Sequence, residues 1–343
     1  MRSRKYNDQR QIIIAASDTA LQIVSPTKRF FEIVDPLVGV ATLFCMVLPD
    51  ARTIRIGTPF VFENPSSNFV GIYNADRSTF HRLMPRGTLR VTLRSQATAS
   101  GVWFSAVNDP AVANPAYGLS KFDDYLSGLL GYGDTGITPV PSGAGAAMAV
   151  STLLASSGRQ GVIHVRPGTT ATGYALGYYG ATPFYLGGGC CAAEASLTEQ
   201  ALSAAADEYI LRFGIHNNIT GGAPTDGIYL LYDHLNLGVN LQARNINSVA
   251  GGGNTTVDTG VPMPATPNWM KLRVEVNSAA LRSDYFVNNA LVSGVGGIVT
   301  RLPLTTTALK LLNIGMTNSA YTSVIHQANV DYSRIQSYPN TPR

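Results

Sequence analysis

Apolar and charged residues alternate along Trp269–Asn277, the clearest local pattern in the chain. After the tryptophan the order is Met-Lys-Leu-Arg-Val-Glu-Val, so every second residue is apolar and the residues between are charged. A period of two residues predicts a β-strand with one face in a core and the other toward solvent. Tyr285–Val287, about ten residues further on, is predicted to be the returning strand.

Short segments of this kind recur along most of the chain, separated by turns rich in Gly, Pro, Asn and Asp. In the first hundred residues the turn signals recur about every ten residues, which is typical of antiparallel sandwiches and barrels. We therefore predict an all-β protein. Residues 196–207 are the one stretch with a helical pattern, for which Ser196 or Thr198 would serve as the N-cap.

The chain of 343 residues is long enough for about two domains. We predict a flexible, basic N-terminal arm over residues 1–15 and a small antiparallel β-sandwich or barrel, for attachment or oligomerisation, over residues 16–105. Residues 106–120 contain Asn-Asp-Pro and Asn-Pro-Ala without a strand pattern and are the predicted linker. A larger two-sheet sandwich is expected over residues 121–343.

Charged residues make up only 13% of the chain, against about 25% in ordinary soluble domains. Low charge indicates either a surface covered by partner subunits or one that is polar without being charged. We expect a homo-oligomer, with a trimer as the specific prediction. No apolar run reaches the ~18 residues of a membrane-spanning helix. The three cysteines define no disulfide framework, which is consistent with folding in a reducing cytoplasm.

The N-terminal arm carries several cations that could dock on an acidic protein surface or on nucleic acid. The candidate docking residues are Arg2, Arg4, Lys5 and Arg10. Tyr6 is the only aromatic residue among them, and the net charge of +4 is modest. Nucleic-acid binding is therefore not expected.

Candidate chemistry is sparse. A glycosidase needs two carboxylates ~5–9 Å apart, and Glu275 has no second acid two or four residues away on its own strand. Asp258-Thr-Gly matches the aspartic-protease signature, but that mechanism needs a second such segment and the chain has none. The five histidines lack metal-ligand spacing, so no cofactor is predicted. A structural Ca²⁺ is not predicted either, although loops rich in Asp and Asn hold the oxygen ligands that it uses.

Aromatic residues are dense between residues 174 and 185. Their functional interpretation is a surface that stacks against sugars or a partner, and the competing interpretation is sandwich core plus subunit interface. The candidate surface residues are Tyr174, Tyr178, Tyr179 and Tyr185.

Several segments of the second half, taken in order, resemble the concanavalin-A-like (laminin-G-like) jelly-roll domains of tailed-bacteriophage virion proteins. These segments are Gly161–Gly173, Glu208–Ile215, Asp226–Asp233, Trp269–Asn277, Tyr285–Asn288 and Val330–Tyr332. In such domains the equivalent of residues 202–207 is a turn before a strand, which competes with the helix considered above. The first half, through Phe60–Asn64 and Gly101–Trp103, is more faintly similar to small β-domains of phage fibres and appendages.

This resemblance implies a non-enzymatic structural protein of a tailed-phage virion: a tail fibre, an appendage or a capsid decoration component. Its partners would be other virion proteins of the capsid or tail, and it would be assembled in the bacterial host cytoplasm. The alternative function is a lectin-like receptor-binding module that recognises a host surface glycan. A polysaccharide-degrading enzyme is the less favoured third hypothesis.

Overall fold

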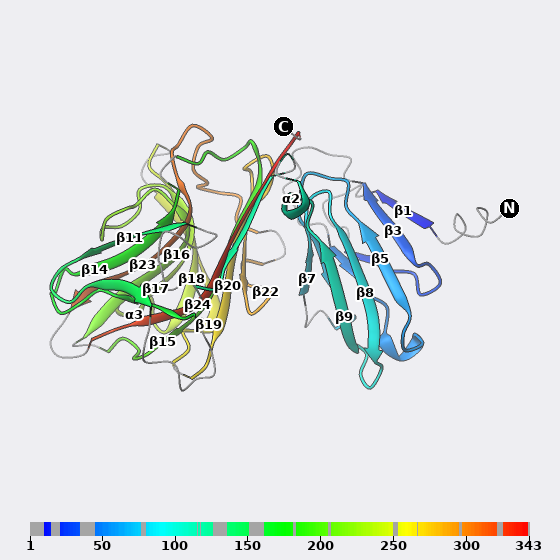
Figure 1. The fold of residues 1–343 in the computed structure, drawn as a ribbon, viewed down its shortest axis with the longest axis horizontal. Helices are drawn as coiled ribbons and strands as arrows, with labels where there is room; N and C mark the ends of the chain where they lie inside the picture. The colour runs from blue at the N-terminus through cyan, green and yellow to red at the C-terminus, as the bar shows by residue number, and fades with distance from the viewer. Residues whose placement is uncertain are drawn as a thin grey trace.

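A computed structural model describes most of the chain, and nearly all regular structure in the described parts is β-strand. The described residues are 10–14, 21–34, 45–76, 80–114, 116, 118–125, 136–150, 161–180, 183–204, 207–249, 253–265, 267–294, 297–320 and 325–341. They form four sheets, two in each half of the chain (Figure 1). The predicted fold class, a small β-domain followed by a larger jelly-roll sandwich, is confirmed.

The strands between residues 10 and 108, called the small domain below, form two sheets around one apolar core. The five-stranded sheet has the order β1-β3-β5-β8-β9, and the four-stranded sheet has the order β2-β4-β6-β7. Their bounds are β1 Arg10–Ile14, β2 Leu21–Ile23, β3 Phe30–Val34, β4 Cys45–Val47, β5 Pro59–Glu63, β6 Val70–Tyr73, β7 Phe80–Leu83, β8 Thr88–Ser95 and β9 Val102–Asn108, with a 3-10 turn η1 at Ala51–Thr53.

The small domain differs from the prediction in one respect, because it is not purely antiparallel. The pairs β1–β3, β3–β5, β2–β4 and β4–β6 are parallel. From β1 to β6 the chain alternates between the two sheets, so successive strands of one sheet are joined through a strand of the other. Such a crossover brings the chain back in the same direction, whereas a direct hairpin reverses it. Turn spacing in the sequence does not distinguish these two connections.

The predicted flexible arm is also corrected in part. Residues 1–9, and with them Arg2, Arg4 and Lys5, lie outside the described residues. Arg10–Ile14 forms strand β1, which pairs in parallel with β3. The β-branched run Ile12–Ile14 explains why this segment becomes an edge strand rather than part of a flexible arm.

The strands from residue 119 onward, called the large domain below, form a sandwich in which the strand pairs are antiparallel. One sheet has the order β12-β13-β24-β15-β20-β21-β22, with β10 also paired to β24, and the other has the order β11-β14-β23-β16-β17-β18-β19. The bounds are β10 Leu119–Asp123, β11 Ile137–Ser142, β12 Ala147–Val150, β13 Ile163–Arg166, β14 Tyr174–Tyr179, β15 Gly189–Glu199, β16 Glu208–His216, β17 Gly227–Asp233, β18 Asn240–Asn247, β19 Gly253–Pro262, β20 Met270–Val276, β21 Ser283–Val287, β22 Ala290–Leu291, β23 Lys310–Ala320 and β24 Ala328–Pro339.

Two short helices complete the described elements, α2 at Pro110–Ala113 and α3 at His234–Leu237. The predicted linker, residues 106–120, therefore includes the end of β9, helix α2 and the start of β10. The helix considered for residues 196–207 is not formed: Ser196–Glu199 continues β15, and Ala204 bridges to Asp207. Pairing of β15 with both β20 and β24 outweighs the weak local helix propensity.

Part of the outer face of the eight-stranded sheet is closed to solvent, because the small domain packs against it. Successive side chains of β15 point to opposite faces of the sheet, and the adjacent residues Cys190 and Cys191 show this. Cys191 lies in the core between the two large-domain sheets, and Cys190 lies in a separate apolar cluster at the domain junction. That cluster joins both domains and consists of Phe69, Met84, Ala111, Cys190, Ala192 and Tyr338. Figure 1 shows the two domains side by side, with β24 along the junction.

Candidate functional site

The four candidate tyrosines separate onto two surfaces, because side chains alternate across β14. Ala175 belongs to the core between the sheets and Tyr179 packs against that core. Tyr174 and Tyr178 therefore point to the outer face of the seven-stranded sheet. Tyr185 follows the bridge between Phe184 and Leu309 and is 48% exposed. Tyr179 and Tyr185 line the same cavity.

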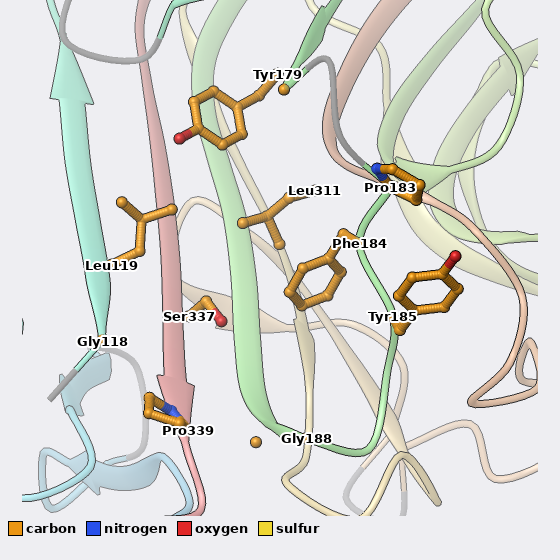
Figure 2. A pocket seen from close by; sticks show the side chains of 12 residues that line it. Gly118, Leu119, Tyr179, Pro183, Phe184, Tyr185, Gly188, Leu311, Ser337 and Pro339 are labelled. Atoms are coloured by element: carbon orange, nitrogen blue, oxygen red, sulfur yellow. The ribbon is translucent and has the colours of Figure 1, made fainter. Parts of the chain in front are cut away.

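This cavity is an open pocket of about 580 Å³ between the two sheets of the large domain. Strands β10, β15 and β24 of one sheet and β14 and β23 of the other contribute to its walls. Its lining residues are Gly118, Leu119, Tyr179, Gly180, Pro183, Phe184, Tyr185, Gly188, Gly189, Leu311, Ser337 and Pro339. Figure 2 shows Tyr179 toward one end and Gly188 toward the other, with Leu119, Leu311 and Phe184 between them.

The pocket is apolar and aromatic, with cations at its margin. Lys121 Nζ lies 5.9 Å from the centre of the Tyr179 ring. Lys310 Nζ donates to the carbonyl of Gly180 at 2.8 Å and lies 4.7 Å from the Tyr178 ring. Apolar rings edged by a few polar groups are typical of sites that stack against a sugar or receive an apolar side chain.

Glycines let the strands approach closely beneath the pocket. Gly118 and Gly189 flank the end of β24, with φ angles of +145° and +152°. A Cβ at Gly118 would lie 2.2 Å from the carbonyl oxygen of Ser337, and one at Gly189 would lie 2.0 Å from that of Tyr338. Both positions need glycine for conformation and for space.

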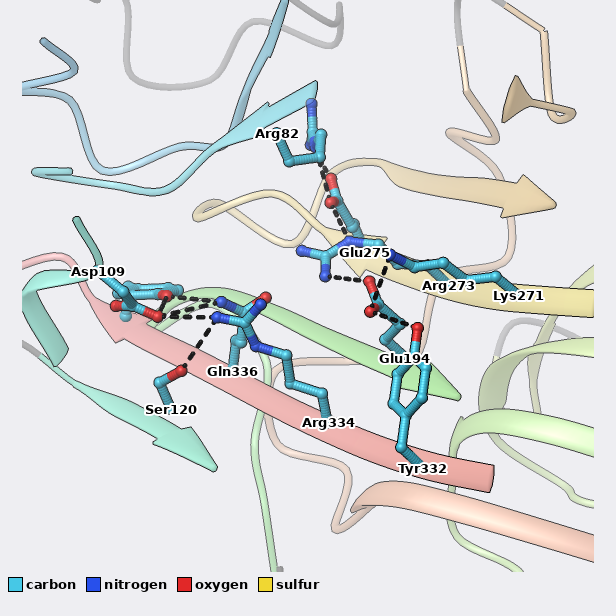
Figure 3. A network of polar contacts seen from close by, with 11 residues as sticks. Arg82, Asp109, Ser120, Glu194, Lys271, Arg273, Glu275, Tyr332, Arg334 and Gln336 are labelled. Carbon is cyan, nitrogen blue, oxygen red and sulfur yellow. Dashed lines mark hydrogen bonds and ion pairs between the residues drawn. The ribbon is translucent and has the colours of Figure 1, made fainter. Parts of the chain in front are cut away.

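Glu275, the acid singled out from the sequence, does have an acidic neighbour in space. Arg273 Nε donates to Glu275 Oε1 at 2.6 Å, and Arg273 Nη1 donates to Glu194 Oε2 at 3.0 Å. Glu194 stands directly opposite Arg273 on β15. Because a single guanidinium contacts both carboxylates, the two acids lie close together in the junction (Figure 3).

These two acids are enclosed in ion pairs rather than open to a substrate. Glu275 is 1% exposed, and Arg82 of the small domain donates from Nε to its Oε1 at 2.7 Å. Arg82 Nη2 and Glu275 Oε2 are also paired. The solvent-facing charge expected at Glu275 is thus a buried one, because the small domain covers this face of β20.

Glu194 is held in its charged form. Burial alone would raise the pKa of this carboxyl, but Arg273 and Lys271 together hold the pKa below its ordinary value. Lys271 Nζ lies 3.1 Å from Glu194 Oε1, and the Tyr332 hydroxyl donates to the same oxygen at 3.1 Å. A general acid needs a raised pKa, so this environment favours a structural ion pair over glycoside hydrolysis.

A second polar cluster ties the linker to β24. The Asp109 side chain caps α2 by accepting from the backbone N–H of Ala111 at 3.0 Å. Its Oδ2 also accepts from the Tyr338 hydroxyl at 2.9 Å, from Arg334 Nη2 at 3.1 Å and from Gln336 Nε2 at 3.3 Å. The linker is therefore held against the large domain.

The surroundings of two other acidic residues, Asp258 and Glu199, account for their shifted pKa values. Asp258 accepts from the backbone N–H of Gly260 at 2.8 Å and from Asn240 Nδ2 at 3.2 Å, and the hydrogen bond from Gly260 is the main cause of its lowered pKa. Glu199 is fully buried at the end of β15, and burial raises the pKa of its carboxyl well above the ordinary value despite a hydrogen bond from Tyr209. Neither residue lines the pocket.

The described residues hold no group of three or more His, Cys, Asp or Glu side chains arranged to bind a metal ion. Within the same part of the chain, no helix is long and apolar enough to cross a membrane. Of the four candidate docking residues, only Arg10 falls in a described segment, strand β1.

Sequence reasoning missed the pocket, because its walls come from segments far apart in the chain. Leu119 and Leu311 are ordinary apolar strand residues in the sequence. A usable signal was the glycine at 118 next to β10 and the pair at 188–189 at the start of β15, since glycine within strands marks close backbone approach.

No protein-family model matches the sequence, and no curated protein matches it. Among solved structures, the chain is similar to the potassium-bound Emp46p carbohydrate recognition domain, with 9% identity, a TM-score of 0.43 and coverage of 65% of this chain and 97% of that one. It is also similar to a protein of unknown function from Shewanella oneidensis MR-1, with 13% identity, a TM-score of 0.46 and coverage of 66% and 89%. A carbohydrate esterase from the Shiga toxin-encoding bacteriophage phi24B matches with 13% identity, a TM-score of 0.41 and coverage of 64% and 97%. These low scores describe a distant likeness in overall arrangement and carry no argument about ligand or activity.

Proposed function

We propose that this chain is a non-enzymatic structural protein of a tailed-bacteriophage virion that assembles into a homo-oligomer through its small domain. Strand β9 carries this proposal. It is the terminal strand of the five-stranded sheet, and six of its seven residues are exposed. Its apolar residues Val102, Phe104 and Val107 are 59%, 54% and 44% exposed.

An exposed apolar edge strand is a surface that soluble monomers usually avoid. The backbone N–H and C=O groups on the open edge of β9, and its exposed apolar side chains, are both available to pair with another copy of the same chain. In a closed ring of three copies, β9 of each subunit would pack against a different surface of the next subunit, so this strand would be covered in every copy. The trimer predicted from composition is therefore retained as the expected assembly.

The domain junction supports a structural role for the whole chain. Apolar contacts, the Arg82–Glu275 ion pair and the Asp109 cluster hold the small and large domains together. Arg86 adds a bond from Nη1 to the carbonyl of Pro339 at 2.9 Å. A module fixed in this way would present the large domain at a set orientation relative to its attachment on the particle.

Replacing Phe104 with aspartate is expected to convert the oligomer into a monomer, because it places a charge in the apolar edge of β9. Light scattering should then change from a mass of about three chains to the 36.5 kDa of one chain. Ile56→Asp is the matched control, since Ile56 is equally exposed, at 53%, but lies outside the strands. A wild-type protein that is a clean monomer at micromolar concentration would refute the proposal.

The pocket favours a second candidate function, recognition of a host surface glycan by the large domain. Tyr185 is half exposed beside the apolar pocket, and aromatic rings at such openings stack against sugar faces. This function is compatible with a place on the virion.

Tyr185→Ala is expected to weaken glycan binding about tenfold, since stacking on one exposed ring contributes about 1–1.5 kcal/mol. The measurement is a glycan array followed by calorimetric titration of the strongest hit. Tyr73→Ala, in the small domain, serves as the control. An array without hits for the wild-type protein would remove this second function.

A further inference from the structure

A continuous row of residues crosses the outer face of the seven-stranded sheet, and most of them are polar. The strand registers place Tyr178 beside Asn313, Asn313 beside Gly214, Gly214 beside Tyr229, Tyr229 beside Arg244 and Arg244 beside Thr256. Arg212 and His216 lie on the same face of β16, two residues before and after Gly214. Two arginines, a histidine and a tyrosine thus share the centre of one sheet face.

Arg212 is a buried cation with no carboxylate in ion-pair contact among the described residues. Its residue is only 9% exposed, and burial is the main cause of its lowered pKa. Among the residues that the structure describes, its one hydrogen bond is a long contact of 3.5 Å from Nη1 to Thr317 Oγ1. Asp233 acts on it only at longer range, and that carboxylate accepts hydrogen bonds from Asn236. Buried charges in proteins are normally paired, so within the described part of the chain this guanidinium lacks a directly bonded counter-ion.

The groups around Arg212 are hydrogen-bonding groups with spare capacity. His216 is 2% exposed, and neither of its ring nitrogens has a hydrogen-bond partner in the described structure. Burial lowers the pKa of this imidazole to about 3, so it is neutral and offers one donor and one acceptor. Arg244 donates from Nε to Thr256 Oγ1 at 3.0 Å and also hydrogen-bonds the side chain of Tyr229, which is 1% exposed. A guanidinium has five N–H donors, so these two contacts leave some of them for a ligand.

Residues 217–226, which connect β16 to β17, cross part of this face and restrict the access of a ligand to it. Between β16 and β17, the carbonyl of Asn218 accepts from Asn313 Nδ2, and the carbonyl of Gly221 accepts from Thr317 Oγ1 at 2.9 Å. The ring of Tyr174 lies beneath Gly221. The connecting segment therefore covers the part of the row that lies on β14 and β23. Tyr229 and Arg244, on β17 and β18, lie farther from these contacts.

We propose that the outer face of the seven-stranded sheet binds the carboxylate of an acidic sugar through Arg212 and Arg244, with Tyr229 and His216 contacting its hydroxyl groups. A guanidinium matches a carboxylate in planar, two-bond geometry, and a carboxylate supplies the missing counter-ion. The inference rests on the glycan-binding function proposed above and assigns it a second surface, separate from the pocket at Tyr185.

The test uses the full chain and two measurements on the variant Arg212→Met. Thermal unfolding of the free protein comes first. Removing an unpaired buried charge while keeping a similar apolar volume should raise the Tm by about 2–4 °C. Arg90→Met, an exposed arginine of β8, is the matched control and should leave Tm unchanged. A fall in Tm for Arg212→Met would show that the residue is a structural cation and would overturn the proposal.

The second measurement is calorimetric titration with acidic oligosaccharides, namely tetragalacturonate, tetraguluronate and a sialylated trisaccharide. The methyl ester of the bound sugar and sodium sulfate at equal ionic strength are the comparisons. We expect at least one acid to bind, its ester to bind at least tenfold more weakly, and Arg212→Met and Arg244→Met to lose at least tenfold in affinity.

Other outcomes separate the two proposals. Acidic sugars that bind equally to wild type and both arginine variants would overturn this site while leaving glycan binding at Tyr185 intact. Equal displacement by sulfate would reduce the site to one for a free anion, which contradicts the assignment to a sugar. Neutral glycans as the only ligands would refute it as well.

Discussion

Glu275→Ala is expected to destabilise the folded chain by about 3–5 kcal/mol. The substitution removes the carboxylate that accepts from Arg82 of the small domain and from Arg273 of the large domain. Both guanidiniums are more than nine-tenths buried and lie 5.2–5.3 Å from the ring of Phe69, so water replaces the lost carboxylate poorly. Chemical denaturation followed by circular dichroism measures the loss.

The same change is expected to uncouple the two domains. With the junction weakened, the small domain should unfold in a separate transition at lower denaturant concentration, whereas we expect the wild-type chain to unfold in one transition. The matched control is the double variant Arg82→Met with Glu275→Leu, which removes both charges and leaves Arg273 paired with Glu194. It should recover most of the lost stability, because an apolar pair of similar volume replaces a buried ion pair at little cost.

A loss below about 1 kcal/mol for Glu275→Ala would contradict this description of the junction, since that is the size of an exposed pair. The Asp50–Arg52 pair supplies the internal comparison. It lies at the surface, with side-chain exposures of 34% and 62%, and Arg52→Ala should leave the denaturation midpoint nearly unchanged.

Gly189→Ala is expected to cost about 3 kcal/mol of folding stability. Its φ of +152° disfavours any residue with a Cβ, and the new methyl group would lie 2.0 Å from the carbonyl oxygen of Tyr338. That oxygen belongs to β24, the strand between β15 and β10, so it has little room to move. The pocket floor should open, and glycan binding near Tyr185 should weaken together with stability.

Gly188→Ala is the control for this effect, because a Cβ there meets nothing within 4 Å. It should change stability by no more than about 0.5 kcal/mol. Equal effects of the two substitutions in thermal unfolding would contradict the close approach of β15 and β24.

The strand pattern was readable from the sequence where alternation was strict. Trp269–Asn277 contains β20, and its expected partner around Tyr285 is β21, with Val274 opposite Tyr285. The expected solvent face of β20 was wrong, because the charged residues there meet another domain. A period of two residues reports that the two faces differ, and it does not report what covers the polar one.

The acidic neighbour of Glu275 was not predictable from local spacing. Glu194 precedes it by about eighty residues and is brought near by the register of β15 against β20. Strand register follows from the packing of whole sheets, and a shift by one residue would move Glu194 into the core. Similarly, the sequence shows that tyrosines are clustered between residues 174 and 185. It does not show which of them line the pocket and which lie on the outer face, because that depends on which face of β14 packs against the core.

The parallel strand pairs of the small domain show a further limit of what the sequence pattern can predict. Each strand and turn between residues 59 and 108 is consistent with antiparallel hairpins, and β8–β9 is one. The crossovers among β1 to β6 depend on which sheet each strand joins, and short apolar strands carry little information about that choice.

Electron cryomicroscopy of phage particles, purified from bacteria in which the gene for this chain is expressed, tests the central proposal most directly. We expect the chain in the particle as a trimer, with the β9 strands of the small domains buried between subunits and the large domains facing outward. Absence of the chain from purified particles, or its presence as single copies with β9 exposed to solvent, would contradict a structural role through this interface.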